Sequence, residues 1–186
     1  MKTALVVDDE PLLRRQVAEA LARFGFDEII EGQNGQEALL LALTHKPILV
    51  IMDVSMPVMN GVQAAESIIE QAPAPIVLLT GSTDPVTIEK AREAGVMNYL
   101  VKPFRDEQLL PAIDLAIHQF IQVSNLKDKV SKLKQSLETR KVVDRAKGVL
   151  MSGGMSEQEA YRKLQKLSMD KRKTLQEVAE AVLLTA

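Results

Sequence analysis

Two adjacent aspartates follow the first apolar run of the sequence. Asp8 and Asp9 stand in the segment LVVDDEP, directly after Leu5, Val6 and Val7. Like charges at the edge of an apolar core repel each other and lose hydration. Either aspartate alone could simply cap a helix that begins at Pro11. Together they offer the clustered oxygens that a hard, octahedral Mg²⁺ ion prefers.

Polar residues also end three later apolar runs. Asp53 ends the third run, Thr80 ends the fourth, and Lys102 follows the fifth. In an open parallel sheet, ligands bind beyond the carboxyl ends of the strands. If one carboxylate attacks phosphorus, the acyl phosphate formed needs cations beside it, which Mg²⁺ and Lys102 would supply. Each residue alone also has an ordinary interpretation, as a loop cap, a strand residue or a surface lysine.

The elements that must position these residues alternate along the first 120 residues. β-Branched apolar runs predict strands, and amphipathic stretches between them predict helices. This alternation indicates an α/β fold with right-handed crossovers around a parallel sheet that carries helices on both faces. The predicted strands are 3–7, 27–31, 47–52, 76–80 and 97–101, and the predicted helices are 11–24, 35–45, 61–70, 85–94 and 107 onward.

Residues 1–120 resemble the receiver domain of two-component response regulators. The matching pieces are VVDDEP, GQNGQEAL, Asp53 followed by MPVMNG, LLTGS and YLVKPF. The resemblance implies a flavodoxin-like (βα)5 doubly wound sheet of strand order 2-1-3-4-5, and a sensor histidine kinase as partner. It implies no enzyme beyond the receiver's own phosphoryl transfer and dephosphorylation. Asn60 and Gly81 depart mildly from the family pattern.

The same resemblance assigns a role to each site residue. Asp53 would be the phosphoacceptor, and Mg²⁺ would be the cofactor. Thr80 and Lys102 would contact the phosphoryl group, and Tyr99 would be the switch aromatic. The implied ligands of the Mg²⁺ ion are Asp8, Asp9, Asp53 and the backbone carbonyl of Ser55.

From about Ile113 the pattern changes to one long helix. Its apolar residues at spacings of 3, 4, 3 and 4 form a heptad seam, with β-branched residues at the first two a positions and leucine at d. This favours a parallel homodimer through a coiled-coil linker at 121–139; the alternative is an amphipathic helix lying on its own domain. The seam residues are Val123, Leu126, Val130, Leu133 and Leu137.

Charge divides the chain at the same place. Residues 1–120 hold 9 Lys and Arg against 17 Asp and Glu, a net −8, whereas residues 121–186 hold 14 against 8, a net +6. A basic module of this kind prefers a polyanion. Residues 140–186 show three helical patterns, with capping boxes at Ser156 and Thr174 and a stop at Gly153 and Gly154.

Residues from about 130 to 185 resemble the ANTAR domain, a three-helix RNA-binding output module of transcription antiterminators, and we assign this domain to residues 140–186. AKGVLM, SEQEAY and LQEVAEAV carry the likeness. It implies binding of hairpin RNA in nascent transcripts, often as a dimer. Tyr161 would either stack on a base or fill the small core, and Gly148 would admit either a second helix or an RNA backbone. The candidate RNA contacts are Arg140, Lys141, Arg145, Lys147, Gly148, Tyr161, Arg162, Lys171, Arg172 and Lys173.

Other functions remain open at this point. The tail could bind DNA, or the protein could be a phosphorelay or dimerisation adaptor without nucleic-acid binding. A metal-dependent phosphatase of the same architecture is a weaker alternative. The 186 residues contain no cysteine, which removes disulfides and thiolate zinc sites. Apolar runs are too short for a signal peptide or a membrane span, so we expect a cytoplasmic protein without membrane insertion.

Overall fold

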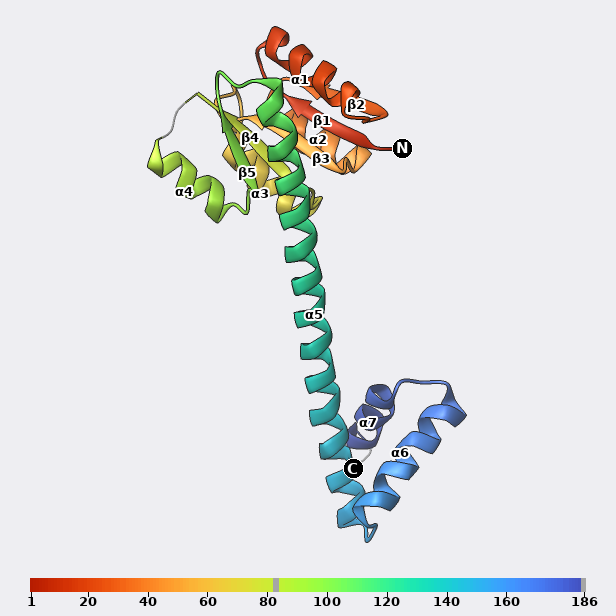
Figure 1. Ribbon diagram of the computed structural model, residues 1–186. Helices are drawn as coiled ribbons and strands as arrows, with labels where there is room; N and C mark the ends of the chain where they lie inside the picture. The colour runs from red at the N-terminus through yellow and green to blue at the C-terminus, as the bar shows by residue number, and fades with distance from the viewer. Residues whose placement is uncertain (82–83, 185–186) are drawn as a thin grey trace. The chain divides into compact units, whose positions relative to one another are not determined.

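The computed structural model describes residues 1–81 and 84–184, which form two compact units, Met1–Val123 and Ser124–Ala186 (Figure 1). The first unit contains a five-stranded parallel sheet of order β2-β1-β3-β4-β5. This confirms the predicted doubly wound sheet and its strand order. The strands are β1 Thr3–Val7, β2 Glu28–Gly32, β3 Leu49–Asp53, β4 Ile76–Thr80 and β5 Asn98–Val101.

Helices cover both faces of this sheet. One apolar cluster joins the sheet to α2, α3 and α4, and a second cluster joins it to α1 and the start of α5. The two central strands β3 and β4 are buried at every position, as their apolar sequences require. The helices are α1 Pro11–Arg23, α2 Gly35–His45, α3 Gly61–Gln71, α4 Pro85–Glu93, α5 Asp106–Ser152, α6 Glu157–Lys171 and α7 Leu175–Leu184.

Predicted helix starts agree with the structure except at one point. Pro11 and Pro85 occupy first-turn positions, and the Asp84 side chain caps α4 by accepting from the Thr87 amide. The N-cap residue of α1, however, is Glu10, and its side chain makes no capping bond. The interpretation of Asp8 or Asp9 as a simple cap of this helix is therefore wrong.

Helix α5 is longer than the sequence pattern indicated. It runs without interruption for 47 residues, so the predicted linker and the first helix of the tail form one helix. Between Pro111 and Gly148 there is neither proline nor glycine to break it, and Gly148 alone costs only about 1 kcal/mol. The helix ends at the predicted stop, where Gly154 has a left-handed φ of 95°. The proposed boundaries at 120/121 and 139/140 thus fall inside a helix and stay predictions.

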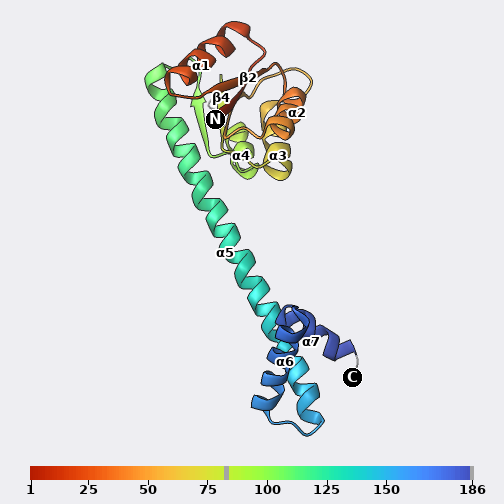
Figure 2. The same cartoon turned by 90° about the vertical axis from the view of Figure 1, so that its right-hand side faces the viewer.

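The second unit is a small helical core built by the end of α5 together with α6 and α7 (Figure 2). Val143, Ala146, Leu164, Val178 and Ala179 are buried in it. Ser156 and Glu159 form the predicted capping box of α6, and Thr174 and Glu177 exchange the same bonds at α7. Across the part of the chain that the structure describes, no helix is long and apolar enough to cross a membrane.

Candidate functional site

Three carboxylates meet at the carboxyl edge of the sheet. Asp8 and Asp9 follow β1, and Asp53 ends the neighbouring strand β3. One oxygen from each of the three lies within 4.8 Å of the others. Asp8 and Asp53 are buried, whereas Asp9 is exposed. The donors are all oxygens, which is the chemistry that fits a Mg²⁺ ion with waters in its remaining positions.

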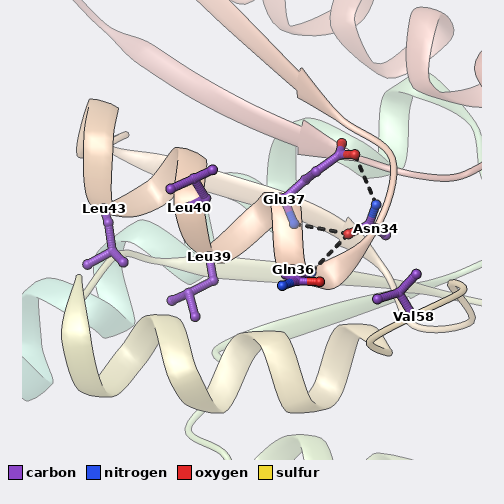
Figure 3. Close-up of a pocket in the computed structure, with 7 residues that line it drawn as sticks. All are labelled: Asn34, Gln36, Glu37, Leu39, Leu40, Leu43 and Val58. Atoms are coloured by element: carbon purple, nitrogen blue, oxygen red, sulfur yellow. Dashed lines mark hydrogen bonds between the residues drawn. The ribbon is translucent and has the colours of Figure 1, made fainter.

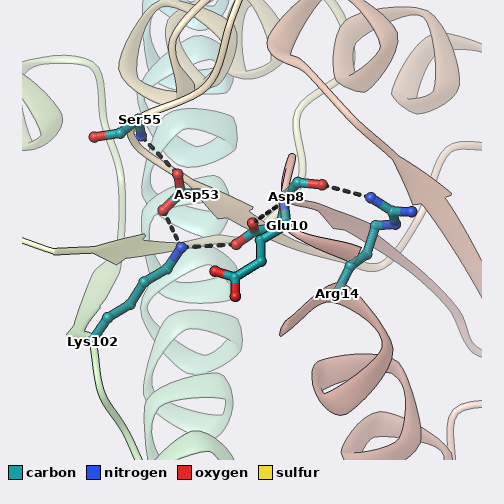
Figure 4. A network of polar contacts seen from close by, with 6 residues as sticks. All are labelled: Asp8, Glu10, Arg14, Asp53, Ser55 and Lys102. Atoms are coloured by element: carbon teal, nitrogen blue, oxygen red, sulfur yellow. Dashed lines mark hydrogen bonds and ion pairs between the residues drawn. The ribbon is translucent and has the colours of Figure 1, made fainter. Parts of the chain in front are cut away.

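Lys102 places a positive charge between two of these carboxylates. Its Nζ lies 2.9 Å from Asp8 Oδ2 and 2.6 Å from Asp53 Oδ1 (Figure 4). Partial burial lowers the pKa of Lys102, but the hydrogen bonds to Asp53 and Asp8 outweigh it and leave that pKa raised. The ammonium group therefore stays charged and offsets part of the repulsion between the two acids.

The second oxygen of Asp53 is held by the chain itself. The Ser55 amide donates to Asp53 Oδ2 at 2.9 Å. A further amide, that of Gly61, donates to the Val54 carbonyl at 2.9 Å and brings the start of α3 against the end of β3. A Cβ at Gly61 would lie 2.0 Å from the carbonyl oxygen of Asp53. Only glycine fits this position, and its signal in the sequence is the dipeptide Asn60-Gly61 before an amphipathic helix.

Arg14 also belongs to the site, and the sequence patterns did not reveal it. Its Nη1 donates to the carbonyl oxygen of Asp8 at 2.7 Å (Figure 4). Its Nε donates to Glu31 Oε2 at 2.7 Å. The Arg14 side chain is only 13% exposed. A cation near a helix N-terminus opposes the helix dipole, so it indicates a specific partner there. The position of Arg14 near the start of a predicted helix was therefore the signal in the sequence that could have indicated a specific partner.

The remaining residues of the predicted receiver site lie as follows. Thr80 is buried at the end of β4. Leu79, the residue before Thr80, pairs with Asp53 in the sheet. Tyr99 on β5 is 41% exposed, and β4 and β5 pair through Thr80 and Val101. The structure thus brings Lys102 into contact with Asp8 and Asp53 and places an Asp9 oxygen within 4.8 Å of theirs; the roles of the predicted site residues, including Thr80, Tyr99 and the Ser55 carbonyl, stay predictions.

A surface hollow of about 440 Å³ lies beside α2, away from any prediction made from the sequence (Figure 3). Leu39, Leu40 and Leu43 line it from α2, and Val58 lines it from the loop before α3. The polar side chain of Asn34 is occupied in capping α2, since its Oδ1 accepts from the Gln36 and Glu37 amides. The Glu37 carboxylate at its edge is also occupied, since it accepts from the Gln33 amide and from the Asn34 side chain, and the rest of the lining is mainly apolar.

In the second unit, Lys147 is engaged in ion pairs. Its Nζ lies 2.8 Å from Asp144 Oδ1 and 2.8 Å from Glu157 Oε1, and the side chain is 16% exposed. The hydrogen bonds to Asp144 and Glu157 raise the pKa of Lys147. These contacts join α5 to the start of α6 and give Lys147 a structural role, while its predicted RNA contact stays a prediction.

The other candidate RNA contacts lie on the surface. Tyr161 is 39% exposed, so its interpretation as a core residue is wrong. A Cβ at Gly148 would meet no described atom within 4 Å, so no second helix of this chain approaches there. Arg140 Nε lies 3.9 Å from Asp144 Oδ2, and Lys141 Nζ lies 2.9 Å from Glu138 Oε1. The exposed basic residues are Arg140, Lys141, Arg145, Arg162, Lys171, Arg172 and Lys173.

The heptad seam is exposed along its whole length. Its five apolar side chains range from 38% exposed at Val123 to 65% at Leu133. Among the described residues, none of the five belongs to a buried apolar cluster of either unit. An exposed apolar stripe of this kind is typical of a surface that packs against another molecule.

Comparison with known proteins agrees with this geometry. The family model of the response regulator receiver domain matches residues 4–114, and that of the ANTAR domain matches residues 131–183. The transcriptional regulatory protein PdtaR of Mycobacterium tuberculosis is 46% identical over 185 residues, which cover 99% of this chain and 90% of that protein. Chemotaxis protein CheY of Bacillus subtilis is 32% identical over 61% of this chain and 96% of its own length.

A solved structure supports the fold of the first unit. The chemotaxis response regulator CheY4 of Vibrio cholerae matches with a TM-score of 0.58 and 33% identity, over 62% of this chain and 98% of that one. The two family models together account for the sheet with its acidic edge and for the basic helical unit. The chain therefore belongs to the response regulators of two-component systems and carries a receiver domain followed by an output domain of the RNA-binding ANTAR type.

Proposed function

We propose that a sensor histidine kinase phosphorylates this protein on Asp53, and that phosphorylation controls RNA binding by the ANTAR domain and thereby transcription antitermination. The observation that carries the proposal is the cluster of Asp8, Asp9 and Asp53 with the Lys102 ammonium between two of them. Structural ion pairs alone do not require three carboxylates within 4.8 Å of one another beside a single lysine.

The chemistry at Asp53 is nucleophilic attack on phosphorus. An Asp53 carboxylate oxygen forms a bond to the phosphorus of a phosphohistidine while the phosphorus–nitrogen bond breaks, and the imidazole nitrogen keeps the bonding pair. The product is an acyl phosphate. Since Lys102 Nζ already lies 2.6 Å from Asp53 Oδ1, a small movement lets it donate to a phosphoryl oxygen instead.

A Mg²⁺ ion held by Asp8, Asp9, Asp53 and the Ser55 carbonyl would supply the further positive charge that the phosphoryl oxygens need. Arg14 contributes by fixing the Asp8 backbone, because its guanidinium holds the Asp8 carbonyl oxygen at 2.7 Å. Thr80, buried at the end of β4, would donate to a phosphoryl oxygen, and Tyr99 would leave its exposed position. These movements alter the surface formed by β4, β5 and the adjoining helices.

The output is RNA binding by the basic unit. The exposed cations of this unit offer a backbone-binding surface whose affinity falls with salt. Exposed Tyr161 offers a stacking face for an unpaired base, as recognition of a hairpin loop requires. Pairing of the heptad seams of two copies would place two such units on neighbouring hairpins and raise their effective concentration.

The test combines modification and binding. Native protein should take up phosphate from acetyl phosphate with Mg²⁺, and phosphorylation should tighten its binding to hairpin RNA. The Asp53→Asn variant should lose both effects, whereas Asp114→Asn, which changes an exposed aspartate on α5, should keep both. Full stimulation of RNA binding in Asp53→Asn would refute the proposed switch. Displacement of the hairpin by duplex DNA at equal salt would point instead to a DNA-binding output.

A further inference from the structure

The flanks of the heptad seam carry basic and neutral residues and no acidic ones. With Val123, Val130 and Leu137 at position a, all three e positions are lysines and the g positions hold glutamine, lysine and serine. The seam therefore has no acidic residue at e or g, the positions that choose the partner in a coiled coil. The e residues are Lys127, Lys134 and Lys141, and the g residues are Gln122, Lys129 and Ser136.

Three of these lysines make no ion pair among the described residues, although Glu138 lies four positions after Lys134, because the Glu138 carboxylate pairs with Lys141. Lys141 lies 2.9 Å from Glu138, but Lys127, Lys129 and Lys134, here termed the linker lysines, make no ion pair with any residue that the structure describes. Asp128 stands between two of them, yet residues one position apart on a helix do not face each other. All three linker lysines are exposed.

This charge pattern opposes the pairing that the apolar stripe favours. In a parallel dimer, a g residue lies beside the e residue of the following heptad on the other helix. Lys129 of one copy then faces Lys134 of the partner subunit, and symmetry makes the contact twice. Exposed Leu126, Val130 and Leu133 still favour burial, so apolar attraction and lysine repulsion act in opposite directions on the pairing of two copies.

We propose that the linker lysines make pairing of two copies depend on a polyanion, so that RNA binding and dimerisation strengthen each other. The occupant of the seam is a second copy of this chain, and the neutralising ligand is a phosphate backbone. The linker lysines run along α5 directly into exposed Arg140 and Arg145, so one backbone can contact both groups. The identification of the polyanion as RNA rests on the proposed function. The repulsion between lysines of two paired copies does not depend on that function.

Phosphate binding and dimerisation must strengthen each other by the same factor, because the two equilibria are thermodynamically linked. If phosphate binds two adjacent lysine rows better than one, then it favours the dimer, and the dimer binds phosphate more tightly by the same factor. Simple salt acts differently on the two steps. It screens the repulsion between copies and so promotes pairing, while it weakens phosphate binding through counterion competition.

Charge reversal at one position tests the pairing. Lys134→Glu turns both Lys129–Lys134 contacts of a parallel dimer into attractive pairs, and Lys129→Glu does the same from the other side. Each single variant should dimerise about tenfold more tightly at low salt. The double variant restores like charges and should lose the gain. Lys132→Glu is the matched control, because it makes the same charge change at outer position c and should shift dimerisation by less than about twofold.

The measurement is sedimentation equilibrium of the full chain at about 0.05 M and about 0.5 M NaCl. Native protein should dimerise more tightly at the higher salt, and Lys134→Glu should dimerise less tightly there. Inorganic tripolyphosphate at matched ionic strength should promote the native dimer beyond the effect of NaCl, and should not promote the dimer of Lys134→Glu.

Several results would overturn the inference. A native dimer that salt weakens, a Lys134→Glu chain that dimerises no better than native, or tripolyphosphate that acts only as NaCl does would each refute it. Native and Lys134→Glu chains that are both monomeric under all conditions would assign the seam to another protein. Tripolyphosphate-promoted pairing without hairpin RNA binding would support the inference and refute the proposed RNA-binding function.

Discussion

Replacing Gly61 by alanine should displace Asp53, the proposed phosphoacceptor, more than any change on the rim of the site. The added Cβ would lie 2.0 Å from the Asp53 carbonyl oxygen, whereas real Cβ contacts essentially never fall below 3.0 Å. The start of α3 or the end of β3 must therefore move by at least 1.0 Å, the difference between these two distances. The opposing atom is backbone, so no flexible side chain can absorb this movement.

Overpacking of this kind costs about 3 kcal/mol, which is a large part of the ~5–15 kcal/mol that stabilises a domain. With a urea dependence of about 1.5 kcal/mol per molar, the unfolding midpoint should fall by about 2 M. Circular dichroism during urea unfolding would measure this. Because a shift of 1 Å in a reacting group can cost about 100-fold in rate, phosphorylation of Asp53 by acetyl phosphate should slow by roughly that factor.

Gly81→Ala is the matched control for Gly61→Ala. A Cβ at Gly81 would meet no described atom within 4 Å, and this glycine also follows a strand at the same edge of the sheet. Its substitution should leave the urea midpoint unchanged or slightly raised. A Gly61→Ala protein as stable as Gly81→Ala, and phosphorylated as fast, would refute the argument that the close approach of α3 positions Asp53.

Three further substitutions test separate contacts. Arg14→Met should lower the free energy of unfolding by about 2 kcal/mol in urea, since the buried Asp8 carbonyl loses a charge-assisted bond; a loss below about 0.5 kcal/mol would contradict this. Ser156→Ala should cost about 1 kcal/mol in thermal unfolding. The Ser156 backbone and side-chain bonds lower the pKa of Glu159, so the stabilisation of native α6 is complete above about pH 4.5 and is lost as pH falls through the lowered pKa. Ser156→Ala should show a smaller loss over that range. Lys147→Met should lower the melting temperature but leave the salt slope of RNA binding unchanged, whereas Arg162→Gln should reduce that slope by about one; equal slopes in the two variants would refute the structural role of Lys147.

The sequence was sufficient to predict the sheet and its acidic edge. Apolar runs alternate with amphipathic ones because parallel strands are buried on both faces and their helices on only one. Once that alternation is recognised, the strand ends must lie together, and the meeting of Asp8, Asp53 and Lys102 follows without knowledge of side-chain conformation. Strand boundaries differ by a residue or two, as at β2, because termini depend on individual hydrogen bonds.

Contacts made by long side chains could not be predicted in the same way. Arg14 reaches the Asp8 carbonyl, and Lys147 reaches Glu157 on another helix, only through particular rotamers. A basic residue looks the same in a sequence whether it faces an acid or solvent. The continuity of α5 was missed for a different reason. Its apolar pattern changes direction along its length, first facing a sheet and later a helical core, and this change resembles a helix boundary.

Each half of the protein holds like charges close together, negative charges in the first half and positive charges in the second. At the sheet edge, buried Asp8 and Asp53 lie close to exposed Asp9, and one lysine only partly neutralises the three carboxylates. On α5, a helix holds the linker lysines in two rows beside an apolar stripe. At the sheet edge, burial keeps the like charges close, and on α5 burial of the exposed apolar stripe would do the same between two copies in the proposed dimer. Each cluster is therefore more stable with its counter-charge than without it. A fold built this way responds to ligands by charge neutralisation, because ligand binding removes a repulsion that is already present in the free protein.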